Sequence, residues 1–188
     1  MSNFYCHPGR AGGSPIWFSA TQGTFGNFDV TLQNTGGSAV GIGGFSFAIT
    51  STNAGITFTA VSTSTLLAYI FAGHSDFGPD ISIGTGTTLS ASDSPDTLPT
   101  PINVAAGATV GLGHVTFSIA SSVPLGSFAI QILAFPSTSL SDALGNNIVI
   151  NTLTNGNITV TPEPGTMLLF PAALGMIAFA SRKSIPQR

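Results

Sequence analysis

The sequence predicts an all-β protein, a β-sandwich followed by a single C-terminal transmembrane helix. Between residues 16 and 160, apolar and polar side chains alternate with a period of two, which is typical of half-buried strands. Short clusters of Gly and Asn separate the alternating runs, and these residues are favoured in tight turns. Beyond residue 164 the chain changes to a charge-free apolar stretch, which indicates a membrane span.

The expected strands follow one another at the short spacing found in two packed antiparallel sheets. They lie at residues 16–18, 28–33, 43–50, 56–60, 115–120, 128–133, 148–150 and 158–160. The chain contains 14 phenylalanines, and those on one face of the strands supply large apolar areas for a core. Residues 63–72 form either a short helix or a strand that leads into a loop. Residues 93–101 hold three prolines and form a loop.

Charged side chains make up only 6% of the chain, against roughly 25% in a typical soluble domain. Gly, Ser and Thr are abundant instead, so hydroxyl and backbone groups form most of the polar surface. Three of the four basic residues form a C-terminal basic cluster, Arg182, Lys183 and Arg188. A nucleic-acid-binding protein needs a clustered basic face on its folded domain. The composition therefore excludes nucleic acid as a partner of the body of the chain.

We interpret residues 1–15 as a disordered or truncated leader region. They contain no apolar core of the roughly 7–15 residues that a signal peptide requires. Either the true start of the protein lies upstream of Met1, which we favour, or the leader has been lost. Cys6 is the only cysteine, so an intrachain disulfide is excluded and we expect a structural role for its side chain.

The C-terminal segment begins with Pro162-Glu163-Pro164, an extended spacer through which neither a strand nor a helix continues. Residues 165–181 carry no charge and span about 25 Å as a helix, slightly less than the ~30 Å hydrocarbon core. The basic cluster beyond them places the C-terminus in the cytoplasm and the β-domain outside. The alternative is a helix packed on the sandwich, but residues 167–180 are apolar or small on every face.

A Pro-Glu-Pro triplet, a short apolar helix and a basic cluster, in this order, resemble the PEP-CTERM sorting domain, over residues 162–188 only. The resemblance implies that a membrane-embedded exosortase recognises Pro162, Glu163 and Pro164, cleaves near them, and releases or re-anchors the protein. It also implies an inner-membrane precursor that reaches the cell surface or the extracellular matrix. Carriers of this domain occur in bacteria that make extracellular polysaccharide.

Residues 16–161 resemble a cohesin domain in the order and spacing of several motifs. These motifs are residues 28–34 (FDVTLQN), 44–47 (GFSF), 115–119 (VTFSI), 126–128 (GSF), 140–146 (LSDALGN) and 153–160 (LTNGNITV). The resemblance implies a jelly-roll β-sandwich of about nine strands, related to carbohydrate-binding modules. It does not imply dockerin binding, because no residue here is matched to a dockerin-contacting position.

We expect no enzyme activity and no catalytic residue. His74-Ser75-Asp76 contains the residue types of a hydrolase triad, but neighbours in sequence cannot adopt the relay geometry. We also expect no cofactor and no metal. The alternative is a structural Ca²⁺ held by aspartates, although neither candidate pair has the ligand spacing of an EF-hand. The candidate pairs are Asp76 with Asp80, and Asp93 with Asp96.

Two hypotheses on function follow from these features. The first is a structural or adhesive protein, sorted by an exosortase, whose hydroxyl-rich surface contacts extracellular polysaccharide through hydrogen bonds. The second is a binding module of the cohesin type that recognises a carbohydrate or a protein partner through one sheet face. An exposed row of aromatic rings would favour the second, and Trp17, Tyr69 and Phe71 are its candidate ligand-contact residues.

Replacing Pro162, Glu163 and Pro164 together by alanine should leave the full-length protein in the inner membrane, because the sorting enzyme loses its recognition motif. Immunoblots of inner-membrane and extracellular fractions measure the processed form. Thr161→Ala, one residue before the motif, is the matched control and should be processed like the wild type. Unchanged processing of the triple variant would contradict the sorting hypothesis.

Overall fold

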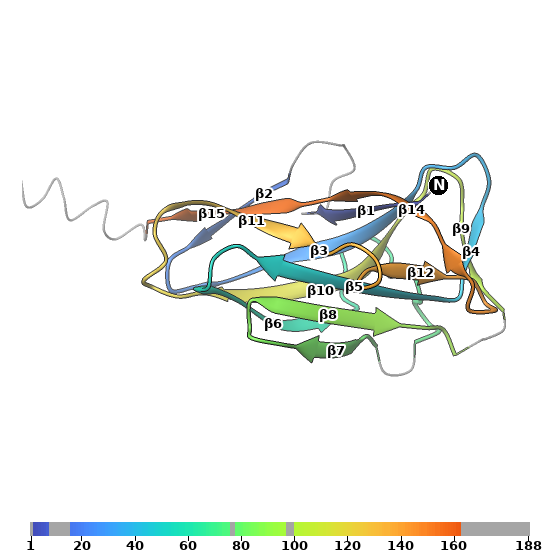
Figure 1. Cartoon of the computed structure of the whole chain (residues 1–188), viewed down its shortest axis with the longest axis horizontal. Coiled ribbons are helices and arrows are strands. Elements are labelled where there is room, and N and C mark those ends of the chain that lie inside the picture. The colour runs from blue at the N-terminus through green and yellow to red at the C-terminus, as the bar shows by residue number, and fades with distance from the viewer. Residues whose placement is uncertain (1, 8–15, 76–77, 97–99, 163–188) are drawn as a thin grey trace, which may run out of the picture.

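The computed structural model describes residues 2–7, 16–75, 78–96 and 100–162 as a two-layer β-sandwich (Figure 1). These residues contain 15 strands in two large sheets and one small pair, and no helix. The predicted all-β sandwich is therefore confirmed. The strands outnumber the nine implied by the cohesin resemblance because several are short pieces of only two or three residues at bends of the chain.

The first large sheet has the strand order β14-β1-β3-β10-β6. Its strands are Ile150–Thr154 (β14), Ser2–His7 (β1), Phe25–Asn34 (β3), Thr109–Ile119 (β10) and Ile56–Ser62 (β6). β1 lies between two neighbours, parallel to β14 and antiparallel to β3. Residues 2–7, which the sequence assigns to a disordered or truncated leader region, thus form an interior strand with ladder pairing on both sides.

The second large sheet has the order β13-β12-β5-β11-β15-β2, and β8 and β7 extend it on the other side of β5. Its strands are Asn147–Ile148 (β13), Ser139–Ser141 (β12), Gly44–Ser51 (β5), Gly126–Ile132 (β11), Gly156–Thr161 (β15), Ile16–Thr21 (β2), Thr88–Asp93 (β8) and Asp80–Ile83 (β7). β5 is the central strand, with β12 and β11 along one edge and β8 along the other. β4 (Val40–Ile42) and β9 (Ile102–Val104) form a separate antiparallel pair.

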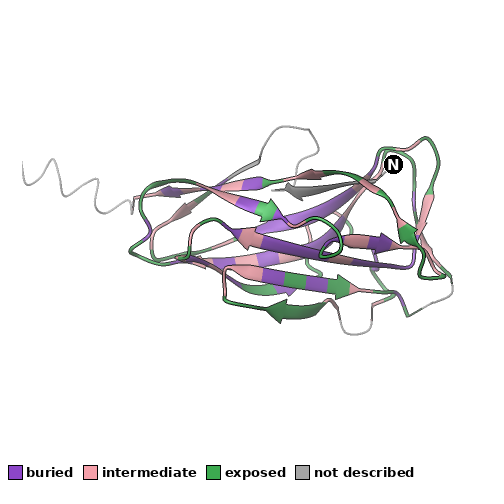
Figure 2. Ribbon diagram, viewed as in Figure 1, coloured by how far each residue is buried: buried purple, intermediate pink, exposed green. Residues whose placement is uncertain are grey.

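Alternating apolar side chains from both sheets fill the space between the layers, and Figure 2 shows where buried residues lie along the strands. Phe28, Phe58 and Phe117 belong to the five-stranded sheet, and the ring of Phe28 contacts the rings of the other two. Phe45 and Phe47 lie on β5 of the eight-stranded sheet and are stacked. All five rings are buried. The period-two pattern thus records which face of each strand is turned to the core.

Two parts of the chain differ from the simplest expectation or lie beyond it. Residues 63–72 form neither a helix nor a strand but a series of turns, with one isolated parallel bridge between Tyr69 and Gly111. Among the described residues, no helix is long and apolar enough to cross a membrane. The predicted helix at 165–181, with Glu163, Pro164 and the basic cluster, lies outside the described residues, which end at Pro162.

Candidate functional site

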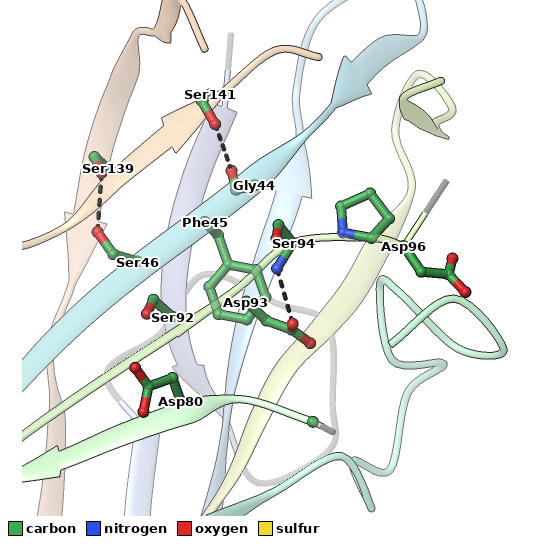
Figure 3. Close-up of a pocket in the computed structure, with 12 residues that line it drawn as sticks. Gly44, Phe45, Ser46, Asp80, Ser92, Asp93, Ser94, Asp96, Ser139 and Ser141 are labelled. Carbon is green, nitrogen blue, oxygen red and sulfur yellow. Dashed lines mark hydrogen bonds between the residues drawn. The ribbon is translucent and has the colours of Figure 1, made fainter. Parts of the chain in front are cut away.

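A groove of about 620 Å³ opens on the outer face of the eight-stranded sheet (Figure 3). One row of side chains crosses four strands from the floor of the groove to its rim at the edge strand β7, each residue directly opposite the next. The row consists of Ser139 on β12, Ser46 on β5, Ser92 on β8 and Asp80 on β7. Residues that are directly opposite in a sheet project from the same face, so all four line one surface. We call this surface the serine-lined groove.

A glycine keeps the floor of the serine-lined groove low. Gly44 is paired with Ser141 of β12, and a Cβ atom built on Gly44 would lie 3.0 Å from the Ser141 hydroxyl oxygen. The next pair on this face of the same two strands, Ser46 and Ser139, belongs to the row described above, and their hydroxyl oxygens lie 2.9 Å apart in a hydrogen bond. Because Gly44 has no side chain, a polar hollow remains between β5 and β12. Two of the hydroxyls beside it, those of Ser46 and Ser139, are already hydrogen-bonded to each other.

Asp93, at the end of β8, is the most heavily hydrogen-bonded carboxylate beside the groove. Its Oδ2 accepts hydrogen bonds from the Tyr69 hydroxyl (2.5 Å) and the Ser75 hydroxyl (2.6 Å). Its Oδ1 accepts one from the Ser94 amide at 2.8 Å. Burial, followed by the hydrogen bond to Asp93 and the charge of Asp93, raises the pKa of the Tyr69 hydroxyl far above its usual value. Tyr69 is therefore a permanent donor to this carboxylate.

A second aspartate, Asp29 of β3 in the five-stranded sheet, also has hydrogen-bond partners from distant parts of the chain. Its side chain is buried, and its Oδ1 lies 2.6 Å from Nδ1 of His114, the residue directly opposite on β10. Its Oδ2 accepts the amide of Leu66 at 2.7 Å. A buried carboxylate needs such partners, because its desolvation is costly without them. Asp29 thus joins β3, β10 and the segment that contains Leu66.

These two aspartates fix the connection between β6 and β7, which is described at residues 63–75 and 78–79. Asp29 holds its beginning at Leu66, and Asp93 holds its middle at Tyr69 and Ser75. The connection also packs closely on β10. A Cβ atom on Gly111 would lie only 2.3 Å from the Thr65 hydroxyl, so that approach requires glycine. The far end of the connection, at Gly78, then forms a wall of the serine-lined groove.

Two polar side chains near the groove, those of Ser75 and His74, each have an aspartate as partner. The Ser75 hydroxyl donates to Asp93, whereas His74 Nδ1 lies 3.5 Å from Asp96 Oδ1. Ser75 is therefore not directed at His74, as a serine nucleophile with a histidine base would be. Among the described residues, no group of three or more His, Cys, Asp and Glu is placed to hold a metal ion. Asp76, of the proposed calcium pair Asp76 and Asp80, lies outside the described residues.

Two of the three aromatic residues expected to contact a ligand, Tyr69 and Phe71, lie in the core and not on the surface. Tyr69 and Phe71 are buried and pack edge to face with each other, and both rings contact Phe45 in the core. They do not form an exposed row, because the connection turns them inward between the sheets. Trp17 lies in β2, and its side chain is outside the described part of the structure.

No family model matches the sequence, and no curated protein matches it. Solved structures do match the fold. CaCohA2 from Clostridium acetobutylicum matches with a TM-score of 0.60 and 19% identity, over 85% of this chain and 91% of that one. The chain has a cohesin-like fold. This conclusion confirms the β-sandwich that the cohesin resemblance implies.

Two other cohesins show that the likeness covers nearly the whole of each domain. The sixth cohesin of scaffoldin B from Acetivibrio cellulolyticus was solved in complex with a Cel5 dockerin. It matches with a TM-score of 0.61 and 15% identity, over 85% of this chain and 99% of that one. A non-cellulosomal cohesin from the archaeon Archaeoglobus fulgidus matches with a TM-score of 0.57 and 12% identity, over 88% and 95%. The cohesin-like fold thus tolerates very different sequences.

The serine-lined groove was not predicted from the sequence. In the sequence, Ser46 belongs only to the motif at 44–47, and Asp80 only to a candidate calcium pair. The outward position of Ser46 was available from the alternation, since its neighbours face the core. The pairing of Ser46 with Ser92 and Ser139 was not, because alternation carries no information on which strands are neighbours.

The buried Tyr69 hydroxyl predicts a loss of stability at high pH. Its pKa is raised on folding, so its contribution is complete below about pH 10, the usual tyrosine value, and declines as the pH rises above that value. Tyr69→Phe should lower the free energy of unfolding at neutral pH by about 1–2 kcal/mol. It should also flatten the decline above about pH 10. Urea unfolding of the full chain measures both.

Tyr5→Phe, at the only other tyrosine, is the control and should keep the steep alkaline decline. A Tyr69→Phe protein that is as stable as the wild type at neutral pH and declines equally steeply would show that the bond to Asp93 contributes nothing.

Proposed function

We propose that the β-sandwich is a protein-binding module and that the serine-lined groove is its contact surface. The observation that carries the proposal is the groove itself, a polar hollow on the open face of a sheet in a cohesin-like fold. Cohesins of this fold have been solved with dockerin partners, among them the scaffoldin B cohesin described above. The proposal is that this chain uses the same kind of scaffold to hold a protein partner.

The groove favours a protein over a polysaccharide because Phe45, the one aromatic residue among the described residues that line it, is buried and offers no exposed platform. Tyr69 and Phe71 lie in the core, and the exposed large apolar side chains among the described residues lie outside the groove lining. Besides Phe45, Gly44, Gly78 and Pro95, the lining consists of five serines and of Asp80, Asp93 and Asp96. Such a surface suits backbone amides and polar side chains that donate hydrogen bonds.

The charge of the groove specifies the partner further. Asp80 and Asp96 are exposed at its rim, and the described residues contain no Lys or Arg to neutralise them. A partner that brings a Lys or an Arg to this rim would form charge-assisted hydrogen bonds with these carboxylates. We therefore expect the partner to present a basic side chain among hydrogen-bond donors.

We further propose that the module acts outside the cell, as a surface or matrix protein sorted by an exosortase. This proposal rests on Pro162-Glu163-Pro164, the apolar segment and the basic cluster of the sequence. The two proposals are compatible, since a low-charge sandwich displayed at the surface can hold a second matrix protein. The alternative of a carbohydrate ligand remains an outcome of the experiment below.

Site-specific photocrosslinking in cells of the source organism tests the binding surface. A benzophenone amino acid replaces Ser92 in the groove of the full chain, or Asn27, exposed on β3 of the other sheet, as the control. We expect a protein adduct from position 92 and none from position 27. Adding Asp80→Lys and Asp96→Lys should reduce the adduct at least tenfold, because the partner's basic group then meets like charges.

The adduct is identified by mass spectrometry after separate treatment with protease and with glycosidases. Equal labelling from positions 92 and 27, or labelling that the two lysines leave unchanged, would contradict binding at the groove. An adduct that only glycosidases degrade would replace the protein partner by a glycan.

A further inference from the structure

The edge strand β7 carries a feature that is independent of the groove floor. All four of its residues, Asp80 to Ile83, are exposed, and among the described strands β7 pairs with β8 alone (Figures 1 and 2). Ile81 and Ile83 expose 36% and 42% of their surface. An open strand with exposed isoleucines is a template for pairing with another strand.

The pairing of β7 with β8 determines which backbone groups point outward. The Gly84 amide donates to the Thr88 carbonyl at 3.1 Å, in the register that pairs Ser82 with Ser90 and Asp80 with Ser92. Hydrogen-bonded pairs alternate along an antiparallel ladder, so Ser82 and Asp80 are bonded to β8. The amides and carbonyls of Ile81 and Ile83 therefore face the open edge.

We infer that the open edge of β7 pairs with β7 of a second copy of this chain, antiparallel, with the two-fold axis at Ser82. In this register, Ile81 lies opposite Ile83 of the partner subunit, and the same pair recurs across the axis. Both pairs are of the hydrogen-bonded kind, so the two strands exchange four backbone hydrogen bonds. The two serines at position 82 meet on the axis, on the solvent face.

This register is the one in which β7 complements itself. An axis at Ile81 would place Ile83 opposite Pro79 of the partner subunit, and proline offers no amide for a ladder. The axis at Ser82 instead pairs isoleucine with isoleucine on one face of the joined sheet. It also separates the two Asp80 carboxylates by four residues, about 14 Å, which exceeds the Debye length of about 8 Å at physiological salt.

The dimer has a consequence for the groove. The two-fold axis of an antiparallel pair stands perpendicular to the sheet, so both serine-lined grooves open on the same side. They lie at opposite ends of the β7 pair, since Asp80 marks the groove end of each strand. A partner that carries two binding elements would thus be held bivalently, with a gain in avidity. The pairing of β7 does not depend on the proposed function.

A charge exchange at the axis tests the inference. Ser82→Lys and Ser82→Glu each bring like charges face to face across the axis, and each should weaken dimerisation of the full chain at least tenfold. An equimolar mixture of the two variants should restore the dimer as a heterodimer. Sedimentation velocity in a non-ionic detergent measures the dissociation constants.

Ser90→Lys is the matched control, because Ser90 is exposed on the same face one strand further in. Its counterpart in the dimer lies about 14 Å away, three strand spacings, so its effect should be below threefold. Circular dichroism confirms that each variant is folded. A wild type that stays monomeric at millimolar concentration would overturn the inference. So would a mixture of the Lys and Glu variants that dimerises no better than either alone.

Discussion

Two aspartates, one on each sheet, hold the long connection between β6 and β7 against the sandwich, and the shape of the serine-lined groove depends on them. The Asp29 carboxylate is hydrogen-bonded to His114 and to the Leu66 amide, and the Asp93 carboxylate accepts hydrogen bonds from the hydroxyls of Tyr69 and Ser75. The described residues include no Lys or Arg, so neutral donors and one histidine satisfy these carboxylates. Hydrogen bonds to charged groups are the stronger ones, which suits a chain with so few ions.

The connection links the core to the candidate site. Its inward turn buries Tyr69 and Phe71 against Phe45, and its far end reaches the groove at Gly78. A displacement of the connection would therefore change the packing of the core and the wall of the groove together. The floor of the groove is made by strands that are paired with one another. The proposed binding surface thus combines a fixed serine floor with a wall that two carboxylates hold in place.

Much of the fold could be predicted from the sequence, because a period of two shows which face of a strand is buried. Phe28 and Val30 on β3 and Phe45 and Phe47 on β5 are buried as the alternation predicts. Alternation does not show which strands are neighbours, so the row from Ser139 to Asp80 could not be foreseen. The conformation of residues 63–72 could not be predicted for another reason. Apolar side chains of this segment enter the core from turns, which follow no regular period.

The candidate site shows the same limit in its polar residues. Asp29 and Asp93 occupy ordinary positions in or at the end of strands, and their partners lie far along the chain. Hydrogen exchange tests whether they hold the connection, read at the amides of Leu66 and Gly78 relative to Ile49 in the core. Asp29→Ala should speed exchange of Leu66 at least about tenfold, and Asp93→Ala that of Gly78, which donates to Ser75. Unchanged protection of both amides in both variants would contradict this account.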